Sequence, residues 1–188
     1  RNVAIGHSSQ EYGDVGYLNT SVGSFSLTQT NGELNTAVGS KALFANTIGY
    51  ENTALGFEAL KANTIGNSNT ALGHRSMKKN TDGYSNTAIG YESQVNSQTG
   101  NLNTSIGKES LKNNNNINNI AIGVEALKTD INGEGNIAVG NFSMKNRSGG
   151  VFNIGVGVDA LLSNNGDRNL SLGVQSGYNN TSGSDNIF

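Results

Sequence analysis

The chain contains no cysteine and no proline. Without cysteine, neither disulfides nor a metal–thiolate site can cross-link the fold, and the redox compartment is left open. No apolar run approaches the roughly 18 residues of a membrane span, and no basic stretch followed by an apolar run opens the chain. We therefore expect no membrane insertion of this segment.

Large apolar residues and charges are both scarce. Leu, Ile, Val and Phe make up 43 of the 188 residues, which is close to the roughly 20% below which chains tend to be disordered. The formal net charge is only −2, so the strong charge typical of disordered chains is missing. With 12 Lys and Arg and a pI near 5.6, a nucleic-acid partner is not expected. A thin but regularly placed core fits this composition, and self-association would bury more of its surface.

The chain is organised by a short repeated phrase, seen in Asn35-Thr36-Ala37-Val38-Gly39. Successive copies are 16 or 17 residues apart, and they begin at Asn2, Asn19, Asn35, Asn52, Asn69, Asn86, Asn103, Asn119, Asn136, Asn153 and Asn169, with the start of a twelfth at Asn186. A period this strict predicts a solenoid, in which each unit buries its apolar surface by stacking on its neighbours. Residues 1–188 are thus expected to form a single repeat domain, and because the chain starts and ends inside a repeat we expect it to be a fragment of a longer protein.

Numbered from its leading Asn, each unit has a fixed residue type at several positions. Position 5 is Gly in all eleven complete units, position 4 is always aliphatic, and position 3 is only Ala, Ser or Gly. The alternation predicts a strand with positions 2 and 4 on one face and position 3 on the other. The Gly implies a backbone conformation or a close approach that a Cβ would forbid. The small residues imply close packing against another chain or across a narrow coil.

A second pattern follows the Gly and is clearest in Glu58-Ala59-Leu60-Lys61. It predicts a short helical turn or a bent strand with Leu60 pointing inward, and on one helical turn the acid and the base would pair by a few tenths of a kcal/mol. The rest of the unit is a polar return such as Asn46-Thr47-Ile48-Gly49. The three 16-residue units lose their residue there, so the return is expected to be a surface turn. The stacked leading Asn residues are expected to hydrogen-bond along the array.

The phrases NVAIG, NTAIG and NIAIG resemble the Ser-Val-Ala-Ile-Gly repeats of the head domains of trimeric autotransporter adhesins. The longer unit containing EALK is similar to repeats of trimeric phage tail fibres and other bacterial surface fibres. Over essentially the whole chain, this resemblance implies a parallel β-roll, three chains wound side by side, and a rigid adhesive or receptor-reaching fibre. The unit here is longer than the adhesin repeat and carries the Glu-x-Leu-Lys insertion, which leaves open the coil shape and the face at the trimer axis.

The sequence shows no catalytic constellation, no metal site and no cofactor site, and the chain is not expected to be an enzyme. His7 and His74 both occupy position 6 but are four units apart, or roughly 19 Å, which is too far for a shared metal. The acidic residues do not follow the spacing of calcium-binding β-rolls. Threonines occupy position 2 from Thr20 to Thr104, as an ice-binding face would require, but Ile and Leu then replace them, which favours a packing role.

Exposed aromatic residues are the candidates for ligand binding. Tyr50 and Tyr84 fall at position 16 and Tyr91 at position 6, and a tyrosine offers an apolar ring face and a polar tip to a sugar or a protein. The leading hypothesis is a homotrimeric structural and adhesive fibre head segment. It would be extracellular, on a bacterial cell surface or a phage tail fibre, and would bind a cell-surface glycan or protein receptor. The alternative is a monomeric β-solenoid that binds ice or a glycan through one flat face.

Overall fold

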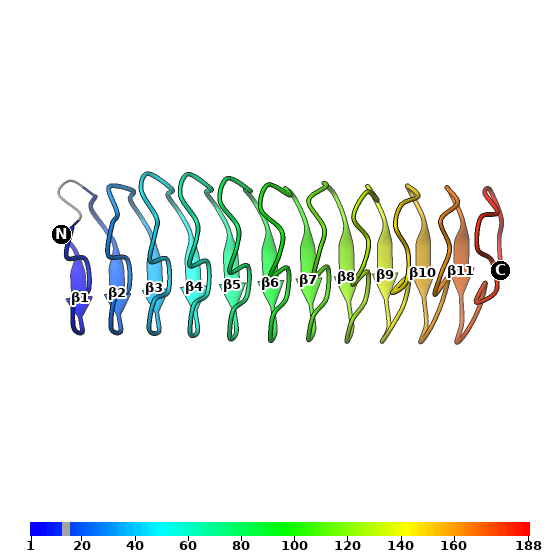
Figure 1. Ribbon diagram of the computed structural model, residues 1–188, viewed down its shortest axis with the longest axis horizontal. Coiled ribbons are helices and arrows are strands. Elements are labelled where there is room, and N and C mark those ends of the chain that lie inside the picture. The colour runs from blue at the N-terminus through cyan, green and yellow to red at the C-terminus, as the bar shows by residue number, and fades with distance from the viewer. Residues whose placement is uncertain (13–15) are drawn as a thin grey trace.

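The protein is an all-β parallel solenoid, as the repeat predicts. A computed structural model describes residues 1–12 and 16–188, and in it eleven strands pair in parallel in chain order. Figure 1 shows them side by side along a rod, with the two termini at opposite ends. The strands are β1 (Val3–Ile5), β2 (Thr20–Val22), β3 (Thr36–Val38), β4 (Thr53–Leu55), β5 (Thr70–Leu72), β6 (Thr87–Ile89), β7 (Thr104–Ile106), β8 (Ile120–Ile122), β9 (Ile137–Val139), β10 (Ile154–Val156) and β11 (Leu170–Leu172).

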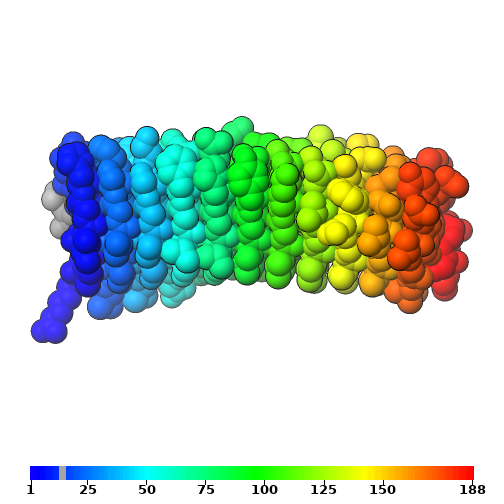
Figure 2. Space-filling view, turned by 90° about the horizontal axis from the view of Figure 1, so that it is seen from below, coloured from blue at the N-terminus to red at the C-terminus, as the bar shows by residue number. Residues whose placement is uncertain are grey.

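The strands are in register, so equivalent positions of the repeat lie side by side. Thr53 pairs with Thr70, and Leu55 pairs with Leu72. The same repeat positions pair between all the other neighbouring strands, as between β5 and β6. The coil that belongs to each strand is numbered here with its strand, so coil 2 spans residues 19–34 and coil 3 spans residues 35–51. In Figure 2 the coils form successive columns along the rod, which matches an array in which each unit packs on its neighbours.

The leading Asn ties each coil to itself and to the next coil. The Asn69 backbone N–H donates to Oδ1 of Asn52 (3.0 Å), while Nδ2 of Asn52 donates to the carbonyl of Gly66 in its own return (2.8 Å). The expected ladder is therefore confirmed, although its most regular donor is the backbone N–H rather than the side-chain amide. One side chain satisfies buried backbone groups of two coils, and an aliphatic residue offers neither a donor nor an acceptor for this.

The Gly at position 5 is required both by conformation and by space. Gly56 has φ +136°, and a Cβ added to it would lie 2.4 Å from the carbonyl oxygen of Gly73 in the next coil. Its N–H donates to the carbonyl of Val38 in the preceding coil (2.8 Å). The backbone conformation and the close approach that the sequence predicted for this Gly are therefore both present.

Of the two alternatives expected after this Gly, the helical turn was wrong: the segment is a bent turn and belongs to none of the eleven strands. The described residues contain no helix, and so none that could cross a membrane. Positions 7 and 9 and the last position have left-handed backbone in every coil, as in Glu58 (φ 55°) and Leu60 (φ 50°). Alternating left-handed residues cannot propagate an α-helix. They direct the Glu58 N–H to Ser40 of the preceding coil (3.0 Å) and the Leu60 N–H to Ser76 of the following coil (3.0 Å).

The core is a narrow column inside the coils. It is made of the small residue of the strand and the residues at positions 8 and 9, such as Ala54, Ala59 and Leu60, all of them fully buried. Position 3 therefore points into the coil, which confirms close packing across a narrow coil as the reason for its small size. The Leu at position 9 points inward, as predicted.

Candidate functional site

The outer side of the sheet is an apolar surface that the single chain leaves partly open. We call it the aliphatic face; it consists of positions 2 and 4 of all eleven strands. Leu55 and Leu72, in the middle of the rod, are 43% and 39% exposed, and Ile106 and Ile122 are also exposed. A contiguous apolar strip of this kind is unusual on the surface of a monomeric protein.

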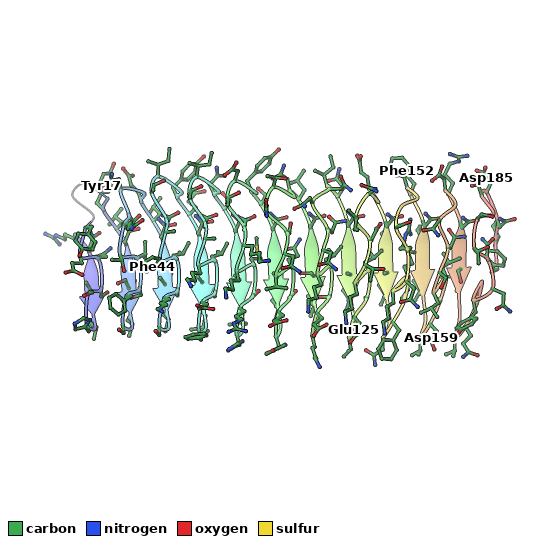
Figure 3. All side chains as sticks on the ribbon, in the orientation of Figure 1. Tyr17, Phe44, Glu125, Phe152, Asp159 and Asp185 are labelled. Carbon is green, nitrogen blue, oxygen red and sulfur yellow. The ribbon has the colours of Figure 1, made fainter. Side chains whose placement is uncertain are left out.

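One edge of the rod carries charges and stacked rings, and we call it the charged edge. Figure 3 labels Glu125 and Asp159 on this lower edge. Acids at position 7 pair with bases of the same and of adjacent coils: Lys78 Nζ lies 2.8 Å from Glu58, and Lys128 Nζ lies 2.7 Å from Glu109. The expected pairing within a unit is present, as in Lys61–Glu58 at 2.8 Å, but it needs no helix.

These pairs shift the titration of the carboxylates. Partial burial alone would raise the pKa of Glu58, but hydrogen bonds from Lys61 and Lys78 outweigh it and lower the pKa to about 2. The pKa of Glu109 is also lowered, chiefly by its hydrogen bond from Lys128. Such a network of opposite charges links neighbouring coils and is structural in character, because no acid in it is left without a cation.

Tyr91 lies on this charged edge, in a stack of rings at position 6. The rings of Phe57 and His74 are 5.3 Å apart, and those of His74 and Tyr91 are also 5.3 Å apart, nearly parallel. One face of the Tyr91 ring is thus covered by His74, and its hydroxyl hydrogen-bonds to Glu92. His7 packs instead on Phe25, so the two histidines belong to different ring pairs.

Tyr50 and Tyr84 lie on the opposite edge, which is formed by the polar returns and which we call the return edge. Figure 3 labels Tyr17, their counterpart at position 16, on this upper edge. Tyr50 and Tyr84 are exposed, as expected for contact groups. The structure therefore brings two of the three predicted tyrosines to one edge and places Tyr91 on the other, so the three do not form one site.

The return edge is hollowed beside Tyr50. An open cavity of about 310 Å³ is lined by Asn31, Gly32, Glu33, Leu34, Ile48 and Tyr50. The carboxylate of Glu33 accepts a hydrogen bond from the Tyr17 hydroxyl, and this bond, together with the negative charge, raises the pKa of Tyr17. Glu33, Leu34 and Ile48 were not singled out from the sequence. The feature of the sequence that could have identified them is the 16-residue length of coil 2, which is one residue shorter than coil 3.

Among the residues that the structure describes, the interior holds one ion pair, which replaces two members of a second ladder. Position 12 is usually Asn, and Asn80 Nδ2 donates to Asn63 Oδ1 at 2.8 Å. In two successive coils the residues are instead Asp130 and Arg147, both buried, with Nε 3.8 Å from Oδ1. Burial raises the pKa of Asp130 to about 6, although the Arg147 charge acts in the opposite direction. The pair fills a structural position and has no access to solvent.

No group of three or more His, Cys, Asp or Glu side chains that could hold a metal ion occurs within residues 1–12 and 16–188. Comparisons of the chain with protein-family models, curated proteins and solved structures gave no match. The function is therefore argued from the surfaces described above.

Proposed function

We propose that this chain is a segment of a homotrimeric structural and adhesive fibre. It would be extracellular, on a bacterial cell surface or a phage tail, and would have no enzymatic activity. The observation that carries the proposal is the aliphatic face, which runs along the whole rod from β1 to β11. A rigid rod with a continuous apolar strip along one side is suited to packing lengthwise against copies of itself.

The physical case for self-association rests on that face. Each strand contributes two outward side chains, and in every strand at least one of them is aliphatic. Burying apolar surface stabilises association by roughly 25 cal/mol per Å². Parallel copies in register would align eleven equivalent layers, so a small gain per layer becomes large over the rod. The number three comes from the resemblance of the NTAIG-type phrases to repeats of trimeric fibres.

The adhesive part of the proposal rests on the return edge. The strands and their core repeat with little variation, because stacking dictates them, whereas the returns vary in length and side chain. Variable residues on a rigid scaffold are where recognition is usually found. The receptor would be a cell-surface glycan or protein, and Tyr50 and Tyr84 are the proposed contacts on this edge. Tyr91 is a weaker candidate, because its ring face and its hydroxyl are both occupied.

A second candidate is a monomer that binds ice or a glycan through one flat face. The observation in its favour is that the threonine column at position 2 lies on the outside of the coil, where Thr53 and Thr70 are exposed. Adjacent strands place these residues about 4.8 Å apart in a straight row. Beside the row, however, position 4 is aliphatic throughout, which suits packing between chains.

Mass in solution separates the two candidates. Light scattering is expected to give about three times the 19.6 kDa chain mass for the fibre segment. A single-chain mass together with thermal hysteresis in ice growth would overturn the trimer and support the monomer. Attachment is tested separately, by asking whether the trimer binds to target cells and competes with the parent particle. Failure to bind would leave a spacer that only sets the reach of the fibre.

A further inference from the structure

The cavity on the return edge arises from one missing residue. Coil 2 has 16 residues, whereas coil 3 has 17, and the two returns align so that Gly32 lies over Gly49, where a Cβ on Gly32 would be 1.9 Å from the Gly49 carbonyl oxygen. Thr30 aligns with Asn46, which donates to its hydroxyl, and the Asn31 N–H donates to the Thr47 carbonyl, so Ile48 is the residue without a counterpart in coil 2. Its side chain is 61% exposed, whereas Ile65, which stacks beside it in the next coil, is 48% exposed. The missing residue leaves a notch bounded by Ile48.

Each bounding group of this notch has a distinct chemical character. Ile48, Leu34 and the ring of Tyr50 provide apolar surface, and Tyr50 and Leu34 are both about half exposed. Glu33 is half-buried and already accepts a hydrogen bond from Tyr17. No Lys or Arg lines the cavity, and Glu51 lies on the adjacent coil, where its N–H donates to the Glu33 carbonyl (3.0 Å). The notch is therefore apolar on its sides and acidic at one end.

The other two short coils differ from coil 2 in how the side chains of their returns bond to the next coil. In coil 7 the side-chain amide of Asn116 donates to the Ile131 carbonyl of the next coil (2.8 Å). In coil 10 Arg168 forms a bidentate ion pair with Asp185 of the next coil. In coil 2, no side chain of residues 31–34 hydrogen-bonds to coil 3. The notch at coil 2 thus keeps its apolar walls and its carboxylate available.

We propose that this notch binds one pyranose ring of an uncharged glycan, with the apolar face of the sugar against Tyr50, Leu34 and Ile48 and its hydroxyl groups donating to Glu33. A volume of about 310 Å³ accommodates one sugar ring with its ordered water. A pyranose has an apolar C–H face and hydroxyl edges, which matches an aromatic and aliphatic wall beside a carboxylate. An acidic sugar is excluded, because it would meet Glu33 and Glu51 with no cation in the lining.

This inference deepens the adhesive role proposed above, and the two can fail independently. The trimer and its attachment to cells do not require this notch, since the receptor could be contacted elsewhere along the return edge. Conversely, the notch is built from two coils of one chain, so it is present in a trimer and in a monomer alike.

The test is an NMR titration of the intact chain with methyl glucopyranoside, methyl galactopyranoside and methyl glucuronide in turn. Binding of a neutral pyranoside with a Kd of about 1 mM is expected, the weak affinity typical of a single small ring. Tyr50→Ala should weaken it at least about ten-fold by removing the stacking surface. Tyr178→Ala is the control, because Tyr178 is exposed to a similar extent (41% against 46% for Tyr50) but lies in coil 11, far along the rod from the notch; it should change the Kd less than about two-fold.

A second pair of variants tests the notch itself. An isoleucine inserted between Asn31 and Gly32 restores 17 residues to coil 2 and should abolish binding by filling the space beside Ile48. The same insertion between Asn115 and Asn116 lengthens coil 7 and should leave binding intact. Circular dichroism and light scattering confirm that both variants keep the fold and the mass of the parent chain. If insertion in coil 2 disrupts folding, the comparison of Tyr50→Ala with Tyr178→Ala decides.

Three results would overturn the assignment. The first is no binding of either neutral pyranoside at concentrations well above the expected Kd. The second is binding that survives both Tyr50→Ala and the coil 2 insertion, which would place the sugar elsewhere. The third is stronger binding of methyl glucuronide, or binding of lysine methyl ester in place of sugars, which would show that the notch recognises charge.

Discussion

Residues of coil 6 that depart from the repeat leave buried polar groups without hydrogen-bond partners among the described residues. Position 9 is Leu or Met in most coils, but in coil 6 it is Gln94, which is fully buried with neither its amide nitrogen nor its amide oxygen hydrogen-bonded within the described chain. In the same coil Ser97 replaces the Asn of position 12, and the side-chain oxygen of Asn80 is left without a donor. The apolar column at position 9 and the asparagine ladder at position 12 are therefore both interrupted at coil 6.

Replacing Gln94 with Leu is expected to stabilise the fold by about 1–3 kcal/mol, since an unpaired buried amide is replaced by an apolar group of similar size. The backbone adds no strain, because Leu60 and Leu111 have the same left-handed conformation. Urea denaturation measures the gain. The control is Gln175→Leu, which makes the same chemical change at an exposed left-handed position and should alter stability by less than about 0.5 kcal/mol. Equal effects of the two changes would show that burial is not the cause.

The strand residue Ala88 tests the narrow coil. Its side chain points into the core and is fully buried, so Ala88→Leu should destabilise the fold by about 1–3 kcal/mol through overpacking. Thr87→Ile is the control: its side chain points outward, and Ile already occupies that position in β8. Thermal denaturation compares the two variants. An unchanged melting temperature for Ala88→Leu would mean that the coil has room that the structure does not show.

At the scale of the elements, residue type predicted the strands but not the turns between them. The leading Asn, the Gly and the alternation around Ala54 specify a stacked strand. Each of these residue types is required for one physical reason, and that reason is the same in every coil. Glu58 and Leu60 are common helix formers, and their left-handed conformations come from hydrogen bonds to Ser40 and Ser76 of neighbouring coils. Such contacts between coils override local propensity and are not visible in a single unit.

The candidate site was predictable to a similar extent. Exposure of Tyr50, Tyr84 and Tyr91 followed from their positions outside the core, and the structure agrees. The separation of Tyr91 from the other two could not be predicted without the path of the coil, which places positions 6 and 16 on opposite edges. Unit lengths identify coils 2, 7 and 10 as short, but which gap stays open depends on how side chains such as Asn116 reach the next coil.

The charged edge predicts how stability depends on pH. The pKa of Glu58 is about 2 in the fold and 4.5 ordinarily, so its contribution is complete above about pH 4.5 and is lost as pH falls towards 2. Glu58→Gln should therefore reduce stability at pH 7 by about 1–2 kcal/mol, less than the pKa shift alone implies because solvent at the edge screens the charges. The difference from the parent chain should vanish near pH 2.

Urea denaturation at several pH values measures this difference. The matched control is Glu51→Gln, an exposed carboxylate on the return edge that pairs with no cation among the described residues, and it should leave the stability curve nearly unchanged. A loss of stability in Glu58→Gln that persists at pH 2 would assign the effect to packing rather than to charge.

At the scale of the whole molecule, the solenoid gives the chain one rigid axis and three kinds of surface along it. Eleven coils at about 4.8 Å each make a rod of roughly 50 Å, with the aliphatic face on one side and the charged and return edges at its margins. The buried residues form two hydrophobic clusters, one ending at Ala88 and one starting at Leu111, and Gln94 lies between them. The thin core is thus interrupted within each chain, whereas the aliphatic face continues past coil 6 without a break.

The proposed assembly through the aliphatic face can be tested by substitution. Changing Leu55 and Leu72 together to Lys puts two charges into adjacent layers of the proposed interface in every chain, and like charges buried without partners disfavour association strongly. The mass by light scattering is expected to fall from about three chains to one. The circular dichroism spectrum should be retained, because neither side chain contributes to the core inside the coil.

The matched control changes Ile65 and Ile131, two aliphatic residues of the return edge, to Lys. They are 48% and 53% exposed, more than Leu55 and Leu72, so an interface that simply followed exposed apolar surface would be lost at least as readily in the control. We expect the control to keep the mass of the parent chain. If the control dissociates and the Leu55 and Leu72 variant does not, the chains meet through their return edges. The notch at coil 2 would then lie at the interface, and the aliphatic face would be the surface left to meet a ligand.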